Sequence, residues 1–213
     1  MSQVDGAREQ VNDRIVLDLL RTLDADGTRS QRRIAAELGI ALGLVNVYLR
    51  RSVKMGLVKV RQAPARRYAY YLTPKGFSEK SRLTVEYLSR SFSFFREAKN
   101  DLAAIFAHAE ACGLSRLVVL GLSDLCEIAL LRAVDRPIAI VAIVDASAAT
   151  ERFAGVPVVQ SVDDIGVGFD AVVVADMAAS KSVMDAAVAR FGRDRVFAPA
   201  LLGLRDNVSE IVS

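Results

Sequence analysis

The 213-residue sequence has no tryptophan, one histidine (His108) and only two cysteines, Cys112 and Cys126. Two cysteines without a CxxC pair exclude a disulfide-rich secreted scaffold and a cysteine-based zinc site, and we expect both thiols to be reduced and buried. The longest apolar run, residues 138–144, is too short to span a bilayer, and residues 1–10 lack the apolar core of a signal peptide. We therefore expect a soluble, cytoplasmic protein with no membrane partner.

Side chains suited to catalysis are also scarce. His108 falls in a predicted helix that precedes the second half of the chain, where a packing or exposed role is expected. Asp163 and Asp164 are adjacent, and because neighbouring side chains tend to point apart, the pair indicates helix capping rather than a catalytic dyad. We expect no catalytic residue, no metal site and no required cofactor.

Acidic residues are absent between Glu37 and Glu79, although eight lysines and arginines lie there. Residues 1–100 carry 19 Lys and Arg against 10 Asp and Glu, whereas residues 101–213 carry 9 against 15. A field of one sign attracts a polyanion and accelerates its binding. The first half therefore favours a nucleic-acid partner, and the second half does not.

Apolar spacing predicts three short helices in the basic half. Residues 11–23 have helical periodicity that stops at the turn-rich sequence DADG. Ser30 is a suitable N-cap for a second helix, and Gly39 supplies the positive φ that ends it. A third helix, with Val45 and Leu49 on its apolar face, ends at Gly56. Three helices with a short turn before the third are the helix-turn-helix arrangement.

Two strands are expected next, residues 57–62 and 67–73, around a basic loop. They form the wing of a winged helix-turn-helix, which lies along the DNA backbone or minor groove while the third helix enters the major groove. From Pro74 onward the pattern stays helical to Ala111, with apolar residues at three- and four-residue spacing. We interpret this stripe as a dimer seam, and Ser91–Ser93 as a place where the helix could break.

Beyond Gly113, apolar runs of four to eight residues alternate with helical segments. Such runs indicate strands buried on both faces of a parallel sheet. The predicted fold is thus α/β with two domains: a winged helix-turn-helix at residues 1–75, a linking and dimerising helix at 76–112, and a small Rossmann-like parallel sheet at 113–213.

The segment SQRRIAAELGIALGLVNVYLRRSVKMGLVKV, together with YYLTPKGFSEKSRLTVEYLSR, resembles the MarR-like winged-helix regulators associated with exopolysaccharide gene clusters. The resemblance covers about residues 30–90 and implies a dimeric, DNA-binding transcriptional regulator. It places Gly43, Leu44, Asn46 and Val47 on the exposed start of the recognition helix.

Asn46 is the best candidate for reading a base, because an amide pairs bidentately with adenine. Ala41, Leu44 and Val47 would either contact thymine methyl groups or belong to the core. Phosphate contacts are expected from basic residues of the third helix and the wing. With the start of the second helix, the remaining candidate DNA-binding residues are Ser30, Gln31, Arg50, Arg51, Lys54, Arg61, Arg66 and Arg67.

Residues 113–213 resemble, more weakly, the Rossmann-like domain at the start of sugar O-acetyltransferases, through a strand followed by a glycine turn, GVPV and DAVVVA. In parallel sheets, ligands bind at the carboxyl ends of strands. The turn after the first strand has only one glycine and an acidic Asp124, which disfavours NAD, whereas Asp145 follows the second strand where an acid would hold a ribose diol. The candidate ligand-binding residues are Gly121, Leu122, Ser123, Asp145, Asp176 and Ser180.

The leading hypothesis is a homodimeric regulator that binds an inverted repeat of double-stranded DNA and senses a nucleotide or nucleotide-sugar through its second half. Two alternatives remain open. The second half would only mediate oligomerisation or partner docking, or it would be a nucleotide-sugar-modifying enzyme, for which the expected histidine or general base is missing.

Overall fold

The computed structural model describes residues 2–63 and 67–204. The chain divides into two compact units, Met1–Ser91 and Phe92–Ser213. No described helix is both long enough and apolar enough to cross a membrane.

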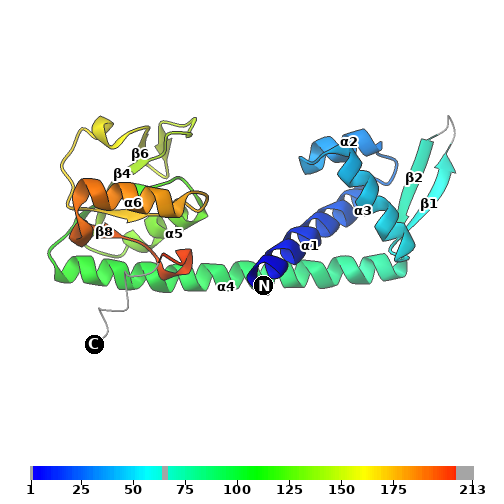
Figure 1. Cartoon of the computed structure of the whole chain (residues 1–213), viewed down its shortest axis with the longest axis horizontal. Coiled ribbons are helices and arrows are strands. Elements are labelled where there is room, and N and C mark those ends of the chain that lie inside the picture. Colours follow the sequence, from blue (N-terminus) through cyan, green and yellow to red (C-terminus); the bar gives the residue numbers. More distant parts are fainter. Residues whose placement is uncertain (1, 64–66, 205–213) are drawn as a thin grey trace. The chain divides into compact units, whose positions relative to one another are not determined.

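The first unit contains three helices, a two-stranded antiparallel sheet and the start of a fourth helix (Figure 1). These elements are α1 (Ser2–Ala25), α2 (Gln31–Leu38), α3 (Leu42–Lys54), β1 (Val58–Ala63), β2 (Arg67–Leu72) and α4 (Pro74–Ala111). Their order is the winged helix-turn-helix order that the sequence predicts.

Local sequence signals fix the ends of α2, as predicted. The hydroxyl of Ser30 accepts a hydrogen bond from the backbone N–H of Arg33 at 3.3 Å. Gly39 ends the helix at φ +63°, a conformation that is costly for residues with a Cβ. These two caps set the short turn between α2 and α3, and therefore the direction in which α3 leaves the core.

The core of this unit is made where one apolar face of each helix meets the base of the wing. Tyr48 on α3 is buried, and its hydroxyl donates a hydrogen bond to the side chain of Asn12 on α1. The other buried residues of this core are Leu19, Leu20, Leu23, Ile34, Ala35, Val45, Leu49, Leu57, Val58 and Tyr70. Burial of apolar surface on this scale is the main source of stability for a small module.

Helix α4 is continuous over 38 residues, so Ser91–Ser93 does not break it. Its apolar stripe divides along its length. Val85 and Phe92 are 64% and 61% exposed, whereas Leu102 and Phe106 are completely buried in the core of the second unit. The last three turns of the stripe are thus packed on the α/β sheet, and the expected seam is restricted to the middle of the helix.

The second unit is an α/β domain with a six-stranded sheet in the order β5-β6-β4-β3-β7-β8. Its elements are β3 (Arg116–Leu120), α5 (Asp124–Ala133), β4 (Ala139–Val144), β5 (Arg152–Phe153), β6 (Val156–Val159), the 3-10 turn η1 (Val162–Asp164), β7 (Ala171–Val174), α6 (Ser180–Phe191), the 3-10 turn η2 (Arg193–Arg195), β8 (Val196–Phe197) and the 3-10 turn η3 (Ala200–Leu202).

The predicted parallel sheet is confirmed for five of these strands. The edge strand β5 runs antiparallel to β6, which the sequence did not indicate because β5 is only two residues long. A tight turn with Ala154 at φ +46° and Gly155 at φ +85° joins the two. The sheet is therefore mixed, with an antiparallel hairpin at one edge.

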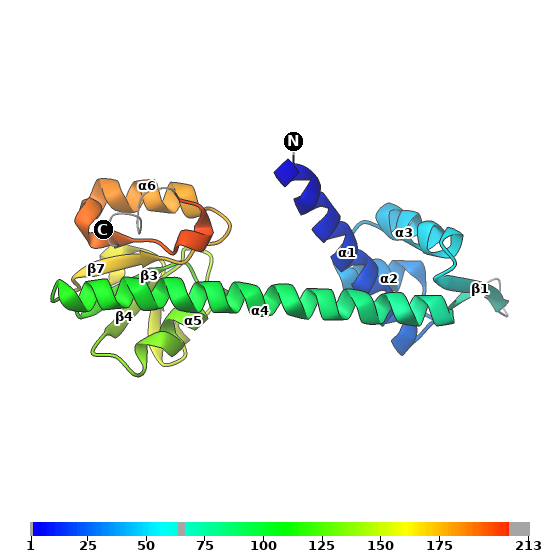
Figure 2. The same cartoon turned by 90° about the horizontal axis from the view of Figure 1, so that it is seen from below.

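Helices cover both faces of the sheet (Figure 2). The C-terminal part of α4 and α5 pack on one face, where Leu117 and Val119 of β3 are buried. On the other face, α6 packs over Val118 and Val172. The connection from β6 to β7 crosses the α6 face with only the short turn η1 in place of a full helix.

The expectation for the cysteines is wrong for one of them. Cys126 lies buried in α5, and burial raises the pKa of its thiol to about 11. Cys112 is exposed, because α4 ends at Ala111 and Gly113, at φ +73°, turns the chain away from the core. Both thiols are free.

The fold makes a specific prediction about Gly76 in the first turn of α4. A Cβ on this residue would lie 2.1 Å from the carbonyl oxygen of Leu57, a backbone atom that already accepts a hydrogen bond from the N–H of Thr73. We expect Gly76→Ala to lower the free energy of unfolding by about 1–3 kcal/mol. Gly43→Ala is the control, since nothing lies within 4 Å of its Cβ position.

Chemical denaturation measures both variants. Gly43→Ala should raise stability by up to about 1 kcal/mol through its better helix propensity. Equal stability of the two variants would contradict the close packing of the first turn of α4 against the backbone of Leu57, just before β1.

Candidate functional site

Helix α3 presents one solvent-facing side. At about 100° per residue, its exposed and half-buried positions fall together, opposite the buried Val45, Tyr48, Leu49 and Ser52. The exposed side carries Gly43, Leu44, Asn46, Val47, Arg50, Arg51 and Lys54. All seven residues that the sequence assigned to the recognition helix therefore lie on one face.

The apolar members of this face are on the surface rather than in the core. Leu44 is 39% exposed and Val47 is 60% exposed, and Ala41, at the N-cap of α3, is also exposed. Asn46 is half-buried. The alternative that Leu44 and Val47 are core residues is thus removed, and methyl groups are available for contact with a partner.

The basic residues of this face differ from those of α2 in their ion pairing. Within the described part of the chain, no carboxylate forms an ion pair with Arg50, Arg51 or Lys54. On the neighbouring α2, by contrast, Arg33 pairs with Glu37 at 3.0 Å. The positive charge of α3 is consequently free to bind an external anion.

On the wing, one further basic side chain is held in position by a neighbouring ring. The guanidinium of Arg61 on β1 lies over the ring of Tyr71 on β2, 5.9 Å from its centroid, so a cation–π contact holds this arginine in place. Arg66 lies outside the described residues. The backbone of Arg67 pairs with that of Ala63 in the sheet.

A polar hollow of about 600 Å³ lies where the start of α2 faces β2. Ser30 caps the helix here, and the side-chain amide of Gln31 donates to the hydroxyl of Tyr70 at 2.7 Å. Gln31 thus ties α2 to the wing. Arg29, Arg33 and Tyr68 also line the hollow. The sequence analysis did not name these three residues. Only their position next to the predicted N-cap and the predicted wing strands could have indicated them.

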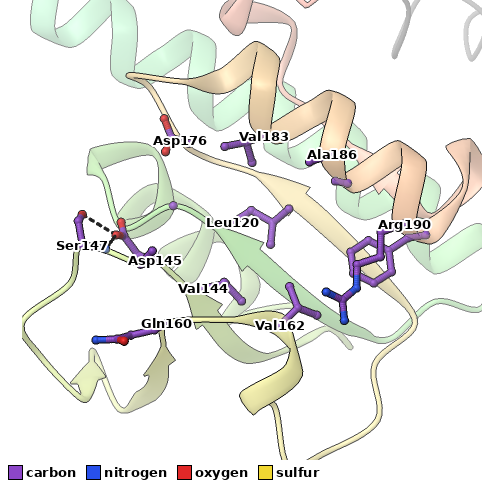
Figure 3. A pocket seen from close by; sticks show the side chains of 14 residues that line it. Leu120, Val144, Asp145, Ser147, Gln160, Val162, Asp176, Val183, Ala186 and Arg190 are labelled. Atoms are coloured by element: carbon purple, nitrogen blue, oxygen red, sulfur yellow. Dashed lines mark hydrogen bonds between the residues drawn. The ribbon is translucent and has the colours of Figure 1, made fainter.

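The second unit has a cleft of about 470 Å³ on the α6 face of its sheet. It lies between α6 and the η1 segment, over strands that the short β6–β7 connection leaves uncovered (Figure 3). Its floor and walls are mainly apolar: Leu120, Val144, Val162, Val183, Ala187 and Phe191. A mostly apolar concavity with a few convergent polar groups is the usual form of a small-molecule site.

Polar groups stand at the two ends of the cleft. Asp145, Asp176 and Ser147 lie at the carboxyl ends of the strands, and Arg190 of α6 lies at the opposite end (Figure 3). Asp145 accepts hydrogen bonds from the hydroxyl of Ser147 at 2.7 Å and the N–H of Leu122 at 2.8 Å. These bonds lower the pKa of the Asp145 carboxyl, so it is ionised at neutral pH.

The structure brings together three of the six residues that the sequence proposed for a ligand. Gly121, Asp145 and Asp176 line the cleft. Ser123 instead caps α5 and donates its hydroxyl to the carbonyl of Ala175 at 2.7 Å. Leu122 packs against the α4–α5 core, and Ser180 begins α6 without lining the cleft. Sequence reasoning missed Arg190 and the other α6 residues.

The residues considered for catalysis have structural contacts. Asp164 completes a capping box with Ser161 at η1, as the sequence indicated. Asp163 forms an ion pair with Arg190. His108 is half-buried, and its ring meets that of Phe197 edge-on with 5.7 Å between the ring centroids. No group of three or more His, Cys, Asp or Glu side chains suited to a metal ion occurs within residues that the structure describes.

Residues 12–59 match the model of the winged helix-turn-helix DNA-binding family. This segment contains the α3 face described above, so the N-terminal unit is a winged helix-turn-helix DNA-binding module. No curated protein matches the chain significantly.

Several solved structures are similar to parts of the chain. A MarR family transcription regulator shares 24% identity over 39% of this chain, with a TM-score of 0.34, and the chain spans 55% of its length. An O-methyltransferase from neocarzinostatin biosynthesis, in complex with S-adenosyl-L-homocysteine, shares 18% identity over 90% of this chain and 82% of its own, with a TM-score of 0.38. A structure of PigF with SAH shares 16% identity over 82% of this chain and 68% of its own, with a TM-score of 0.30.

These TM-scores are too low to define a common overall fold. None of the three structures is a sugar O-acetyltransferase, so the weaker resemblance of residues 113–213 gains no support from them.

The α3 face predicts two separable effects on DNA binding. Replacing Arg50 and Arg51 with Ala should weaken binding to every DNA sequence and reduce the salt-dependence slope by roughly one per lost phosphate contact. Asn46→Ala should mainly reduce the preference for the specific site, by about 1–3 kcal/mol. Fluorescence anisotropy on specific and random duplexes at several salt concentrations measures both effects.

Lys181→Ala, an exposed change on α6, is the matched charge control and should leave binding unchanged. Equal losses on specific and random DNA for Asn46→Ala would remove Asn46 as a base-reading residue.

Proposed function

We propose that the protein is a dimeric, sequence-specific transcriptional regulator. The observation that carries this proposal is the basic face of α3 within a winged helix-turn-helix module, since its cations form no ion pair with a described carboxylate. In this arrangement α3 enters the major groove, Asn46 reads a base, and Leu44 and Val47 contact thymine methyl groups. Arg50, Arg51 and Lys54 then bind phosphates, with Arg61 of the wing along the adjacent backbone.

The proposed dimer forms along the exposed middle of α4, within the segment 76–112 that we propose to link the domains at 1–75 and 113–213. The support is a run of exposed apolar side chains at three- and four-residue spacing: Val85, Leu88, Phe92 and Phe95. A contiguous apolar patch on a surface marks an interaction site, and a stripe along one helix is the usual contact face of a helix pair. A two-fold symmetric dimer binds an inverted repeat with half-sites about one DNA turn, or a multiple of it, apart.

The double change Leu88→Glu and Phe92→Glu tests the seam. Placing two carboxylates on an apolar contact costs desolvation and adds repulsion across a two-fold axis, so we expect the dimer to dissociate into monomers. Sedimentation velocity measures the mass of the full chain. Ala104→Glu, at another exposed position of α4, is the control and should remain dimeric. An unchanged mass for the double variant would contradict a seam on this face.

The α/β unit is proposed to sense an effector of the nucleotide or nucleotide-sugar class in the α6-face cleft. Asp145 follows β4, where an acidic side chain is placed to accept hydrogen bonds from a ribose or sugar diol. Following the resemblance of residues 30–90, we propose polysaccharide or surface-sugar genes as the targets. The alternative role of this unit, supported by how often such folds are reused, is assembly or partner docking alone.

The two roles differ in one measurement. We expect at least one compound from a panel of UDP-sugars, nucleotides, nucleosides, NADH and coenzyme A to change the Kd for the DNA upstream of the protein's own gene at least several-fold. Such a change corresponds to a coupling free energy of about 1–3 kcal/mol. Fluorescence anisotropy with and without each compound measures it. Specific DNA binding that no compound alters would favour the assembly role.

A further inference from the structure

The cleft in the α/β unit differs from a phosphate-binding site in how its backbone amides are used. In doubly wound sheets, a phosphate commonly rests on the free N–H groups that open the helix after the first strand. Here that helix is α5. The N–H of Leu122 is bonded to Asp145, and the N–H groups of Leu125 and Cys126 are bonded to the Ser123 hydroxyl at 3.2 and 3.3 Å. The chain's own oxygens thus occupy three of the N–H groups that a phosphate would use here.

The crevice where the strand order reverses, between β3 and β7, is also closed. Gly121 follows β3, and a Cβ on it would lie 2.6 Å from the Cα of Asp176, which follows β7. The two backbones therefore touch at the place where a dinucleotide pyrophosphate usually lies. The space open to a ligand is on the α6 side, over Leu120 and Val144.

Two carboxylates determine the charge at the strand end of this space. Asp145 is ionised for the reasons given above. Asp176 accepts the N–H of Ala178 at 2.8 Å and of Ala179 at 2.6 Å through one oxygen, while the other oxygen accepts no hydrogen bond from the described residues. No described Lys or Arg forms an ion pair with either carboxylate. An anionic group placed here would be repelled, whereas hydroxyl donors would be bound.

The opposite end of the cleft offers little compensation to an anion. Arg190 is the one basic side chain among the described residues that line it. Both terminal nitrogens of this arginine donate to the carboxylate of Asp163, one of them at 3.2 Å. A bidentate pair of this kind already neutralises the guanidinium. The pair takes two of the five N–H donors of Arg190, so a phosphate bound there would meet a guanidinium whose charge is already offset by Asp163.

We infer that the α6-face cleft binds an unphosphorylated nucleoside, whose ribose hydroxyls donate to Asp145 and Asp176 while its base covers the apolar floor. This inference rests on the proposed sensing role of the cleft and narrows its ligand to the phosphate-free member of the class. Each 5′-phosphate adds negative charge near two fixed carboxylates, so nucleotides bind more weakly than their nucleosides.

Isothermal titration calorimetry of the full-length protein without DNA tests this order. The ligands are adenosine, guanosine, cytidine and uridine, each with its 5′-monophosphate and 5′-diphosphate. We expect at least one nucleoside to bind, and its monophosphate to bind about tenfold more weakly at low salt, with a smaller ratio at high salt. A nucleotide that binds as tightly as its nucleoside, or the absence of binding by all four nucleosides, would overturn the inference.

Three variants locate the site. Asp176→Asn removes the charge but keeps an oxygen for the N–H groups of Ala178 and Ala179, so it should weaken nucleoside binding and narrow the gap to the monophosphate. Ala186→Phe fills the cleft from α6 and should abolish binding. Asp185→Asn, exposed on α6 and outside the cleft, is the matched control and should bind as the original protein does. Unchanged binding by both cleft variants would contradict this site.

The two proposals fail separately. Nucleoside binding without any change in DNA affinity would remove the sensing role and leave the cleft chemistry standing. A change in DNA affinity caused only by a phosphorylated compound would support the sensing role and contradict the preference of the cleft for an unphosphorylated nucleoside.

Discussion

The structure depends on one continuous helix that supplies buried side chains to both units. Helix α4 starts against the wing, where Gly76 meets the Leu57 carbonyl, and its Leu83 is buried. Further along, Leu102 and Phe106 are completely buried in the α/β core. In proteins most of the stability of a helix comes from tertiary packing of its apolar side chains, so both cores contribute to the order of α4. Neither the wing nor the α/β sheet can be repacked without a change in contacts to this helix.

The two units differ in whether their charged side chains are paired, and the proposed partners follow from this difference. In the DNA-binding module, Arg50, Arg51 and Lys54 form no ion pair with a carboxylate of the described residues, which favours a polyanion. In the α/β unit, Asp145 and Asp176 stand at the strand ends, while Arg190 is neutralised by Asp163. A polyanion is attracted to the first and repelled from the second. This separation of charge is consistent with the proposed roles, a DNA site in the first unit and a small-molecule site in the second.

Features set by local sequence could be predicted, and features set by long-range contacts could not. The Ser30 and Gly39 caps and the α3 face follow from residues within one or two helical turns, and the structure confirms them. The role of Ser123 depends on a bond to Ala175, 52 residues away, and that of Arg190 on a pair with Asp163, 27 residues away. No local pattern carries such information. The exposure of Cys112 depends on the direction that the chain takes at Gly113, which the helix end at Ala111, correctly predicted, does not reveal.

Selection of binding sites from a random pool of DNA duplexes tests the central claim most directly, because such a pool samples every short sequence without bias toward one operator. A dimer of winged helix-turn-helix modules predicts an enriched inverted repeat whose half-sites are centred about one helical turn, or a multiple of it, apart. Each half-site should contain an adenine at a fixed position for Asn46. Enrichment of a single unrepeated motif, or no enrichment at all, would contradict the account of a dimeric, sequence-specific regulator.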